Sequence, residues 1–350
     1  MLKKVSAFIF LIISCNFLVF GGIANKSNNK EEKPFFTLSV SPVFEIKNGN
    51  MGEWVFTEKS NYDTNLLSYL DWGITSSFSA GIKSVITIKD FFLNLKFTAG
   101  FPSNCGTLTD SDWLNVEKTT SPQLNYKTSF SEHENHQNYD FCFNAEAGWS
   151  FNIISSFKIS PSFSLNYAKT QFSGVNGQYF YGKYIEVDSE KGYYYPYNSE
   201  NKSYVSTGTY SEAVINYMRE AVSVFIGTDF SYTFNGKYTG YKPLFLSLGF
   251  KIAPFSYTFN LDNHLLKSTD YVDICQGYFK EFNISAKAGY FFTDSFALNF
   301  DFDFTKLNLI TGSVYSKKAS EKYYTQDKYS KGGATAKFYN FSVSCKYVFQ

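Results

Sequence analysis

The sequence predicts an all-β protein, a ten-stranded antiparallel transmembrane β-barrel with long extracellular loops, and three observations lead to this prediction. Short segments of alternating apolar and polar residues recur along most of the chain. Phe, Tyr and Trp make up 20 % of the 350 residues, which suits the aromatic girdles of a membrane barrel. Beyond the N-terminal segment, no apolar run approaches the ~18 residues that a membrane helix needs.

The N-terminus has the pattern of an export signal. A positively charged start (residues 1–4) precedes an apolar run (5–20), and Gly22 and Ala24 supply the small side chains of a cleavage site. Cys15 weakly resembles a lipidation site, but it lies inside the apolar run. Cleavage after Ala24 is therefore the favoured prediction, and the protein is exported.

The rest of the chain divides into a polar leader, residues 25–34, and one barrel domain, residues 35–350. The formal charge is +1, and loss of Lys3 and Lys4 with the signal brings it to −1. Neither value favours a nucleic-acid partner. Outer-membrane lipid is an expected partner, and the barrel is expected to act as a monomer.

Period-2 alternation predicts the strands. They are expected at about 35–48, 67–86, 90–102, 135–152, 157–173, 212–235, 242–254, 274–292, 296–310 and 334–349. The clearest is 296–310, where Phe296, Leu298, Phe300, Phe302 and Phe304 alternate with polar or small residues. Large rings on one face and Asp, Asn and Lys on the other suit lipid outside and a polar lumen.

Connection lengths alternate between short and long. Short turns follow the even-numbered strands, and long loops follow the odd-numbered ones, at about 49–66, 103–134, 174–211, 255–273 and 311–333. In outer-membrane barrels the long loops are extracellular. The predicted location is therefore the outer membrane of a bacterium, with the long loops outside.

Two short polar segments are candidates for chemistry. Asp110 and Asp112 follow the third predicted strand, and Asp262 and His264 follow the seventh. Both strands lead to the extracellular rim, so the two pairs are expected to face each other across the barrel mouth. Alternation places Asp110 and Asp112 inside, but Asp262 and His264 turn inward only if a bulge, plausibly at Ala253-Pro254, shifts the pattern by one residue.

These side chains suit hydrolysis by an activated water. A neutral imidazole at position 264 can take a proton from water, and Asp262 can orient it and stabilise the imidazolium. Asp110 and Asp112 are too close to ionise easily together, so one is expected to keep a proton. The alternative interpretation of each pair is a solvated polar loop.

No metal site is expected. The cysteines that remain after cleavage are scattered, which signals neither a disulfide framework nor a zinc site. His133 and His136 have metal-like spacing, but no third ligand is placed beside them.

The segments Leu108–Trp113, Asp262-x-His264, Asp327–Ala334 and the closing Tyr-Asn-Phe…Lys-Tyr-Val-Phe together resemble the omptins over nearly the whole mature chain. Omptins are ten-stranded outer-membrane endopeptidases that cut between basic residues without a metal. The resemblance implies that Asp110, Asp112, Asp262 and His264 are catalytic. It implies further that Glu53 is a substrate-binding acid and that peptide or protein substrates are partners of the barrel.

Other positions depart from the omptin pattern. The second pocket acid is replaced by Asn260, which weakens the expectation of strict arginine preference. The lipopolysaccharide-binding arginines of the family correspond to Gln171 and Glu220, with Arg219 one step away, so a lipid requirement is either lost or met by lysines. No other cofactor is expected. The alternative function is a non-enzymatic porin or adhesin, or an omptin-like barrel that has lost activity.

Overall fold

The computed structural model describes residues 35–58, 64–116, 126–188, 191–234, 244–293 and 295–349. The predicted signal peptide, 1–24, and the polar leader, 25–34, lie outside the described residues. Within the described ranges, no helix combines the length and apolar character needed to cross a membrane.

Long antiparallel strands form almost all of the described chain. Their bounds are β1 Phe36–Glu58, β2 Thr64–Ile88, β3 Phe91–Gly100, β4 Ser103–Asp112, β5 Ser129–Trp149, β6 Phe151–Ile154, β7 Phe157–Gly182, β8 Tyr184–Asp188, β9 Lys191–Tyr194, β10 Val205–Thr209, β11 Ala213–Phe234, β12 Leu244–His264, β13 Thr269–Gly277, β14 Glu281–Phe291, β15 Phe296–Lys318 and β16 Thr325–Phe349. Two short 3₁₀ helices, η1 Leu114–Val116 and η2 Lys202–Tyr204, lie between strands.

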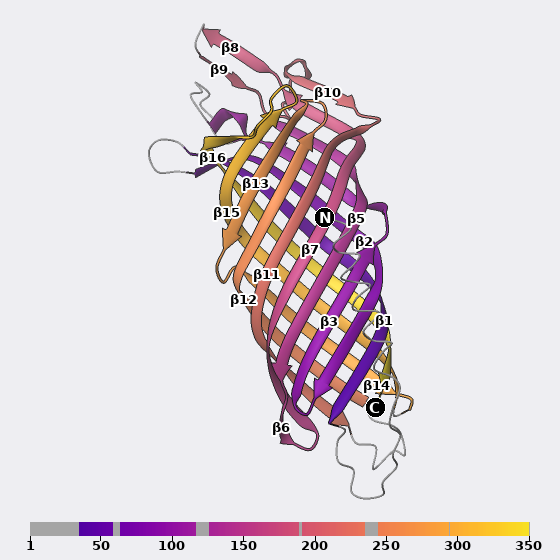
Figure 1. The fold of residues 1–350 in the computed structure, drawn as a ribbon. Helices are drawn as coiled ribbons and strands as arrows, with labels where there is room; N and C mark the ends of the chain where they lie inside the picture. Colours follow the sequence, from indigo (N-terminus) through magenta and orange to yellow (C-terminus); the bar gives the residue numbers. More distant parts are fainter. Residues whose placement is uncertain are drawn as a thin grey trace, which may run out of the picture. The chain divides into compact units, whose positions relative to one another are not determined.

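Strand pairing follows a circuit that returns to its start, as a barrel requires. From β1 it runs through β2 to β3 and β4, then to β5, β7, β11 and β12, on to β13 and β14, and through β15 and β16 back to β1. β3 and β4 both lie between β2 and β5, and β13 and β14 both lie between β12 and β15. Short strands β8, β9 and β10 lie at one end, here called the cleft end, and β6 lies at the other (Figure 1).

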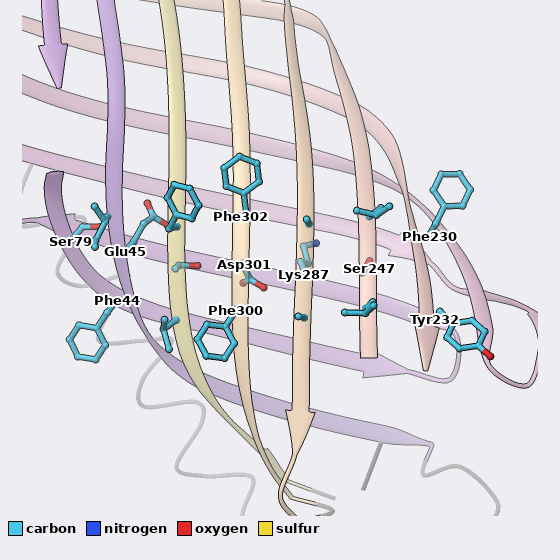
Figure 2. A pocket seen from close by; sticks show the side chains of 18 of the residues that line it. Phe44, Glu45, Ser79, Phe230, Tyr232, Ser247, Lys287, Phe300, Asp301 and Phe302 are labelled. Atoms are coloured by element: carbon cyan, nitrogen blue, oxygen red, sulfur yellow. The ribbon is translucent and has the colours of Figure 1, made fainter. Parts of the chain in front are cut away.

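One end of the wall carries a belt of exposed apolar side chains. Along β12, for example, Leu244, Leu246, Leu248 and Phe250 are exposed while the residues between them face inward. A pocket of about 820 Å³ lies in this part of the wall. Figure 2 shows rings of β1, β11 and β15 around it, with Glu45, Asp301 and Lys287 among them. This belt is the surface that the membrane's acyl chains cover.

Charged side chains fill the barrel interior at the level of the belt. The ion pairs are Lys47–Asp140, Lys83–Asp301, Lys96–Glu45, Lys251–Glu146 and Lys287–Asp229. The Lys251–Glu146 pair joins β12 to β5, which are separated in the circuit by β7 and β11. Such pairs therefore cross the lumen and occupy it.

The prediction of long loops is wrong for much of their length. Strands continue far into the five predicted loop ranges, as β1 does to Glu58 and β12 does to His264. β7 reaches Gly182, and β8–β10 occupy part of the segment that follows. Backbone pairing and an inner apolar core that includes Trp72, Leu108 and Tyr217 hold these extensions, whose outer faces need no apolar alternation.

The predicted bulge at Ala253-Pro254 is confirmed. Val224 of β11 pairs with Phe255 of β12, whereas Ile226 pairs with Ile252, so β12 contains one extra residue at this point. Alternation along β12 reverses there: the buried residues are odd-numbered up to 253 and even-numbered from 256. Proline suits a bulge, because it has no N–H to contribute to the ladder.

Candidate functional site

Asp110 and Asp112 lie at the C-terminal end of β4, where the sequence led us to expect a loop. β4 pairs with β2 on one side and β5 on the other, and Asp110 is opposite both Leu70 and Ser131. Leu108, two residues earlier on the same face, is fully buried in the apolar core at this end of the barrel. The alternation of β4 therefore turns both carboxyl groups inward.

Asp262 and His264 end β12 and also face inward, because of the reversal at Ala253-Pro254. The imidazole Nε2 lies 2.6 Å from Asp262 Oδ2. Asp262 is only 3 % exposed, so the acid has little water of its own. The ring of Tyr271 packs edge-on against the imidazole at 5.1 Å between centroids. Hydrogen bond and ring contact together fix the orientation of the imidazole.

One cleft of about 380 Å³ is lined by three of the four residues. Asp110 and Asp112 line it from β4 and His264 lines it from β12. In the circuit these strands are separated by β5, β7 and β11 on one side and by β2, β1, β16, β15 and β13 on the other. The predicted facing of the pairs across the barrel is thus what the structure shows, although nothing in the geometry alone assigns them a reaction.

The cleft lies beyond the apolar belt, and its carboxyl groups have unusual acidities. Burial, and then repulsion from Asp112, raise the pKa of Asp110 to about 8. Burial likewise raises the pKa of Asp112, against hydrogen bonding from Ser68 and the charges of Lys267 and His264. At neutral pH the couple therefore holds a proton, and its titration belongs to both residues together.

The pKa of the His264 imidazole is raised for a different reason. Burial lowers the pKa of His264, but the charge of Asp262 and the hydrogen bond to it outweigh burial, so the net shift is upward. Because Nε2 is the nitrogen bound to Asp262, the neutral ring places its proton there and leaves Nδ1 free to accept another. The cleft thus combines a base, an orienting carboxylate and a protonated acid.

Sequence reasoning missed several side chains that border the cleft. Lys267, at the tight turn after β12, lines it, and so do Tyr181, Tyr194 and Tyr210 from β7, β9 and the chain after β10. Tyr181 and Tyr210 lie with hydroxyl oxygens 3.5 Å apart. Lys267 lies in the predicted loop 255–273 and the three tyrosines lie in the predicted loop 174–211, and no feature of the sequence assigned any of them a position at the cleft.

Glu53 of β1 is buried in the interior, as a pocket acid would be, and Asp273 of β13 is its unexpected neighbour. Glu53 and Asp273 are each 2 % exposed. Asn260 lies on β12 directly opposite Asp273. The pKa of Glu53 is raised by burial first and then by Asp262 and Asp273.

Arg219 lies in the interior rather than beside the outer wall. It is 4 % exposed, and it donates hydrogen bonds to Asn260 Oδ1, Gly52 O and Thr335 O. On the outer wall, Glu220 instead pairs with Lys169. The expectation that a lysine could replace the lipid-binding arginines stays a prediction.

His133 and His136 lie in β5, and neither meets a further metal ligand. His133 contacts Asn176 O and Ser131 Oγ, while His136 contacts Asn104. Across the described part of the chain, no group of three or more His, Cys, Asp or Glu side chains could hold a metal ion.

Fold and site together define a class: an outer-membrane β-barrel with an acid and histidine cleft at one end. The sequence profile of the Omptin family matches residues 35–349. The chain therefore belongs to the Omptin family, and its place is the bacterial outer membrane. A comparison with curated protein sequences finds no match.

A comparison with solved structures finds the following matches. The outer membrane protease OmpT from Escherichia coli matches with a TM-score of 0.70 and 12 % identity, over 89 % of this chain and 97 % of that one. The translocator domain of the autotransporter NalP from Neisseria meningitidis gives 0.31 and 7 %, over 97 % of each chain. The attachment protein Ail of Yersinia pestis gives 0.23 and 9 %, over 87 % of this chain and 97 % of that one.

Proposed function

We propose that this barrel is an endopeptidase that hydrolyses peptide bonds next to basic residues. The observation that carries the proposal is the shared cleft, with His264 on one wall, hydrogen-bonded to Asp262, and the Asp110–Asp112 couple on the other. Membership of the Omptin family supports it, and the E. coli barrel that matches the fold is by name a protease.

In this proposal, His264 Nδ1 takes a proton from a water held between the two walls. The water oxygen then attacks the carbonyl carbon of the scissile bond. Asp262 stabilises the imidazolium that forms, as an orienting carboxylate does beside other catalytic histidines.

The Asp110–Asp112 couple acts on the other side of the water. Its retained proton hydrogen-bonds to the carbonyl oxygen, where negative charge develops, and its ionised oxygen accepts from the water. Collapse of the tetrahedral intermediate breaks the C–N bond, and the proton held by His264 passes to the leaving amine. Every proton taken from water is thereby returned to a product, and the enzyme ends as it began.

The basic preference rests on Glu53. This buried carboxyl group lies close enough to Asp262 for the two charges to influence each other, so a substrate side chain reaching it would come from the residue next to the cleaved bond. A cationic side chain would relieve the cost of burying that carboxylate.

The contents of the lumen weigh against a porin. Ion pairs that cross the interior, such as Lys251–Glu146 and Lys47–Asp140, occupy the path that ions would take. Planar-bilayer recording checks this alternative, because a porin would conduct whether or not it cuts peptides.

The test of the proposal is a peptide library incubated with refolded barrel, with cut sites read by mass spectrometry. Wild-type protein should cut beside Lys or Arg. His264→Ala should reduce turnover by about 10²–10⁴-fold, the usual contribution of a general base, while heat-modified gel mobility shows that the barrel is folded. Undiminished turnover in His264→Ala would refute the mechanism, and no cleavage by wild type would refute the function.

A further inference from the structure

Asp273 is a buried acid with no role in the proposed reaction. It lies on β13, and its Cα is paired across the ladder with that of Asn260 on β12. Asn260 is the position at which the family resemblance places the second pocket acid. Directly opposed residues on antiparallel strands project to the same face, and both side chains are buried in the interior. β12 therefore lacks a carboxyl group at Asn260, and the facing strand β13 supplies one at Asp273.

The carboxyl groups of Glu53 and Asp273 lie close enough for each to influence the other's pKa. Among the described residues, no donor reaches Glu53 Oε2, Asp262 Oδ1 or either oxygen of Asp273, and all four atoms are shielded from solvent. Buried acceptors without donors are costly, and a structure that retains four together invites a ligand that donates.

Arg219 does not satisfy these oxygens. Its guanidinium nitrogens donate to Asn260 Oδ1, Tyr217 Oη and two main-chain carbonyls. Arg219 acts on the charges of Glu53 and Asp273, but its hydrogen bonds are directed elsewhere. The carboxyl groups of Glu53, Asp262 and Asp273 can therefore accept a second positive charge.

The backbone around Asp273 makes space for its side chain. A Cβ placed on Gly332 of β16 would approach Asp273 Cγ to 2.6 Å, so only glycine at 332 leaves the carboxyl group its position. A metal ion is not the expected occupant, since no three acidic, His or Cys side chains in the described ranges have the geometry to hold one. The remaining candidate is an organic cation with several N–H donors.

We propose that Asp273 determines specificity: with Glu53 it receives the basic side chain of the substrate residue beside the scissile bond, and it replaces the carboxylate that Asn260 lacks. This inference rests on the proposed function and names a second residue of its substrate site. Lysine ammonium carries three donors and arginine guanidinium five. Either can therefore satisfy oxygens from separate carboxyl groups.

Asp262 connects this acid cluster to the cleft. One of its oxygens accepts from His264 and the other has no partner in the described chain. Its charge acts on Asp110, Glu53 and Asp273 alike. A basic side chain beside Glu53 and Asp273 would therefore hold its own backbone near the imidazole.

The experiment compares two peptides that differ only in lysine or norleucine before the cleaved bond. It uses wild type, Asp273→Asn, the transposed variant N260D/D273N and the exposed-turn control Glu321→Gln. Asp273→Asn is isosteric and removes a buried charge, so it should fold. The measured quantity is the ratio of kcat/KM for the lysine peptide to that for the norleucine peptide, which a purely structural role would not change.

Wild type and Glu321→Gln should prefer lysine, and Asp273→Asn should lose about 10- to 100-fold of that ratio, the effect of one lost hydrogen bond to a charged group. N260D/D273N should recover most of the loss, because it restores the carboxylate on the facing strand. An unchanged ratio in Asp273→Asn, or no recovery in the transposed variant, overturns the inference.

A second arm separates this inference from the proposed function. Lysine and norleucine peptides with a reduced, uncleavable bond are titrated into the same four proteins, and binding is followed by tryptophan fluorescence. If wild type cleaves nothing, the endopeptidase proposal fails, and tighter binding of the lysine peptide that is lost in Asp273→Asn still supports the acid site. Equal binding of the two peptides by wild type overturns it.

Discussion

Replacing Asp112 by Asn tests whether the Asp110–Asp112 couple works through a shared proton. The substitution keeps the side chain's shape and removes the charge that, after burial, does most to raise the pKa of Asp110. Residues two apart on a strand are separated by about 7 Å. At an effective dielectric of about 20, unit charges at that distance interact by about 2.4 kcal/mol, which corresponds to between one and two pKa units.

The pKa of Asp110, about 8 in the intact couple, should therefore fall to between roughly 6 and 7 in Asp112→Asn. The reaction needs that proton, so activity is lost as pH rises through the pKa of Asp110. The alkaline limb of the kcat profile should move down by the same one to two units. At pH 7.5 the protonated fraction would fall from about three quarters to roughly 3–24 %.

The acid limb reports His264, which must be neutral to accept a proton. Its pKa is raised above the ordinary value, so wild-type activity should increase with pH only above about 6.5. Loss of the Asp112 charge weakens the stabilisation of the imidazolium, which moves this limb downward as well. The profile should shift to lower pH as a whole.

The assay is cleavage of one lysine-containing fluorogenic peptide by refolded barrel, from pH 5 to 10, with Glu321→Gln as the matched loss of an exposed acid. The test of the shared proton is the pH at which each limb of the kcat profile lies. The maximal kcat is not used, because Asp112 also contacts the reacting water in the proposal. An alkaline limb that stays where wild type has it would refute the shared proton.

Two further predictions concern the bulge and metals. Deletion of Pro254 removes the extra residue of β12, so Asp262 and His264 should turn outward; activity should fall to the level of His264→Ala while the protein still inserts into liposomes, and retained activity would contradict the parity argument. Treatment with 1 mM EDTA followed by dialysis should leave kcat unchanged, because the described residues offer no cluster able to hold a metal; recovery of lost activity by a divalent cation would contradict this.

The part of the barrel that carries the apolar belt could be predicted from sequence, because contact with lipid requires alternating apolar residues there. Phe300 and Phe302 alternate with Asp301 for a physical reason, and the same reason fails beyond the belt. There the outer face meets water, so extensions such as the end of β1 have no apolar signature and were taken for loops. Their pairing partners are far away in sequence, which no local pattern reveals.

The site was predictable to the extent that short motifs and alternation reach. Asp110, Asp112 and His264 line one cleft, Asp262 hydrogen-bonds to the imidazole, and the proline at 254 marked the bulge that turns the histidine inward. Asp273 could not be predicted from the sequence, because only the strand pairing shows that it lies opposite Asn260. Arg219 lies inside and Glu220 outside because neighbouring residues on a strand point to opposite sides of the wall.

The length of the strands has a consequence for what the protein can reach. β7 has 26 residues, whereas about 9–11 suffice to cross a bilayer. At ~3.3 Å per residue and a tilt of about 40°, the surplus corresponds to roughly 38–43 Å of wall. A reactive centre carried at that height stands clear of the lipid head groups, and it is placed to meet molecules arriving from the surrounding medium rather than those lying flat in its own membrane.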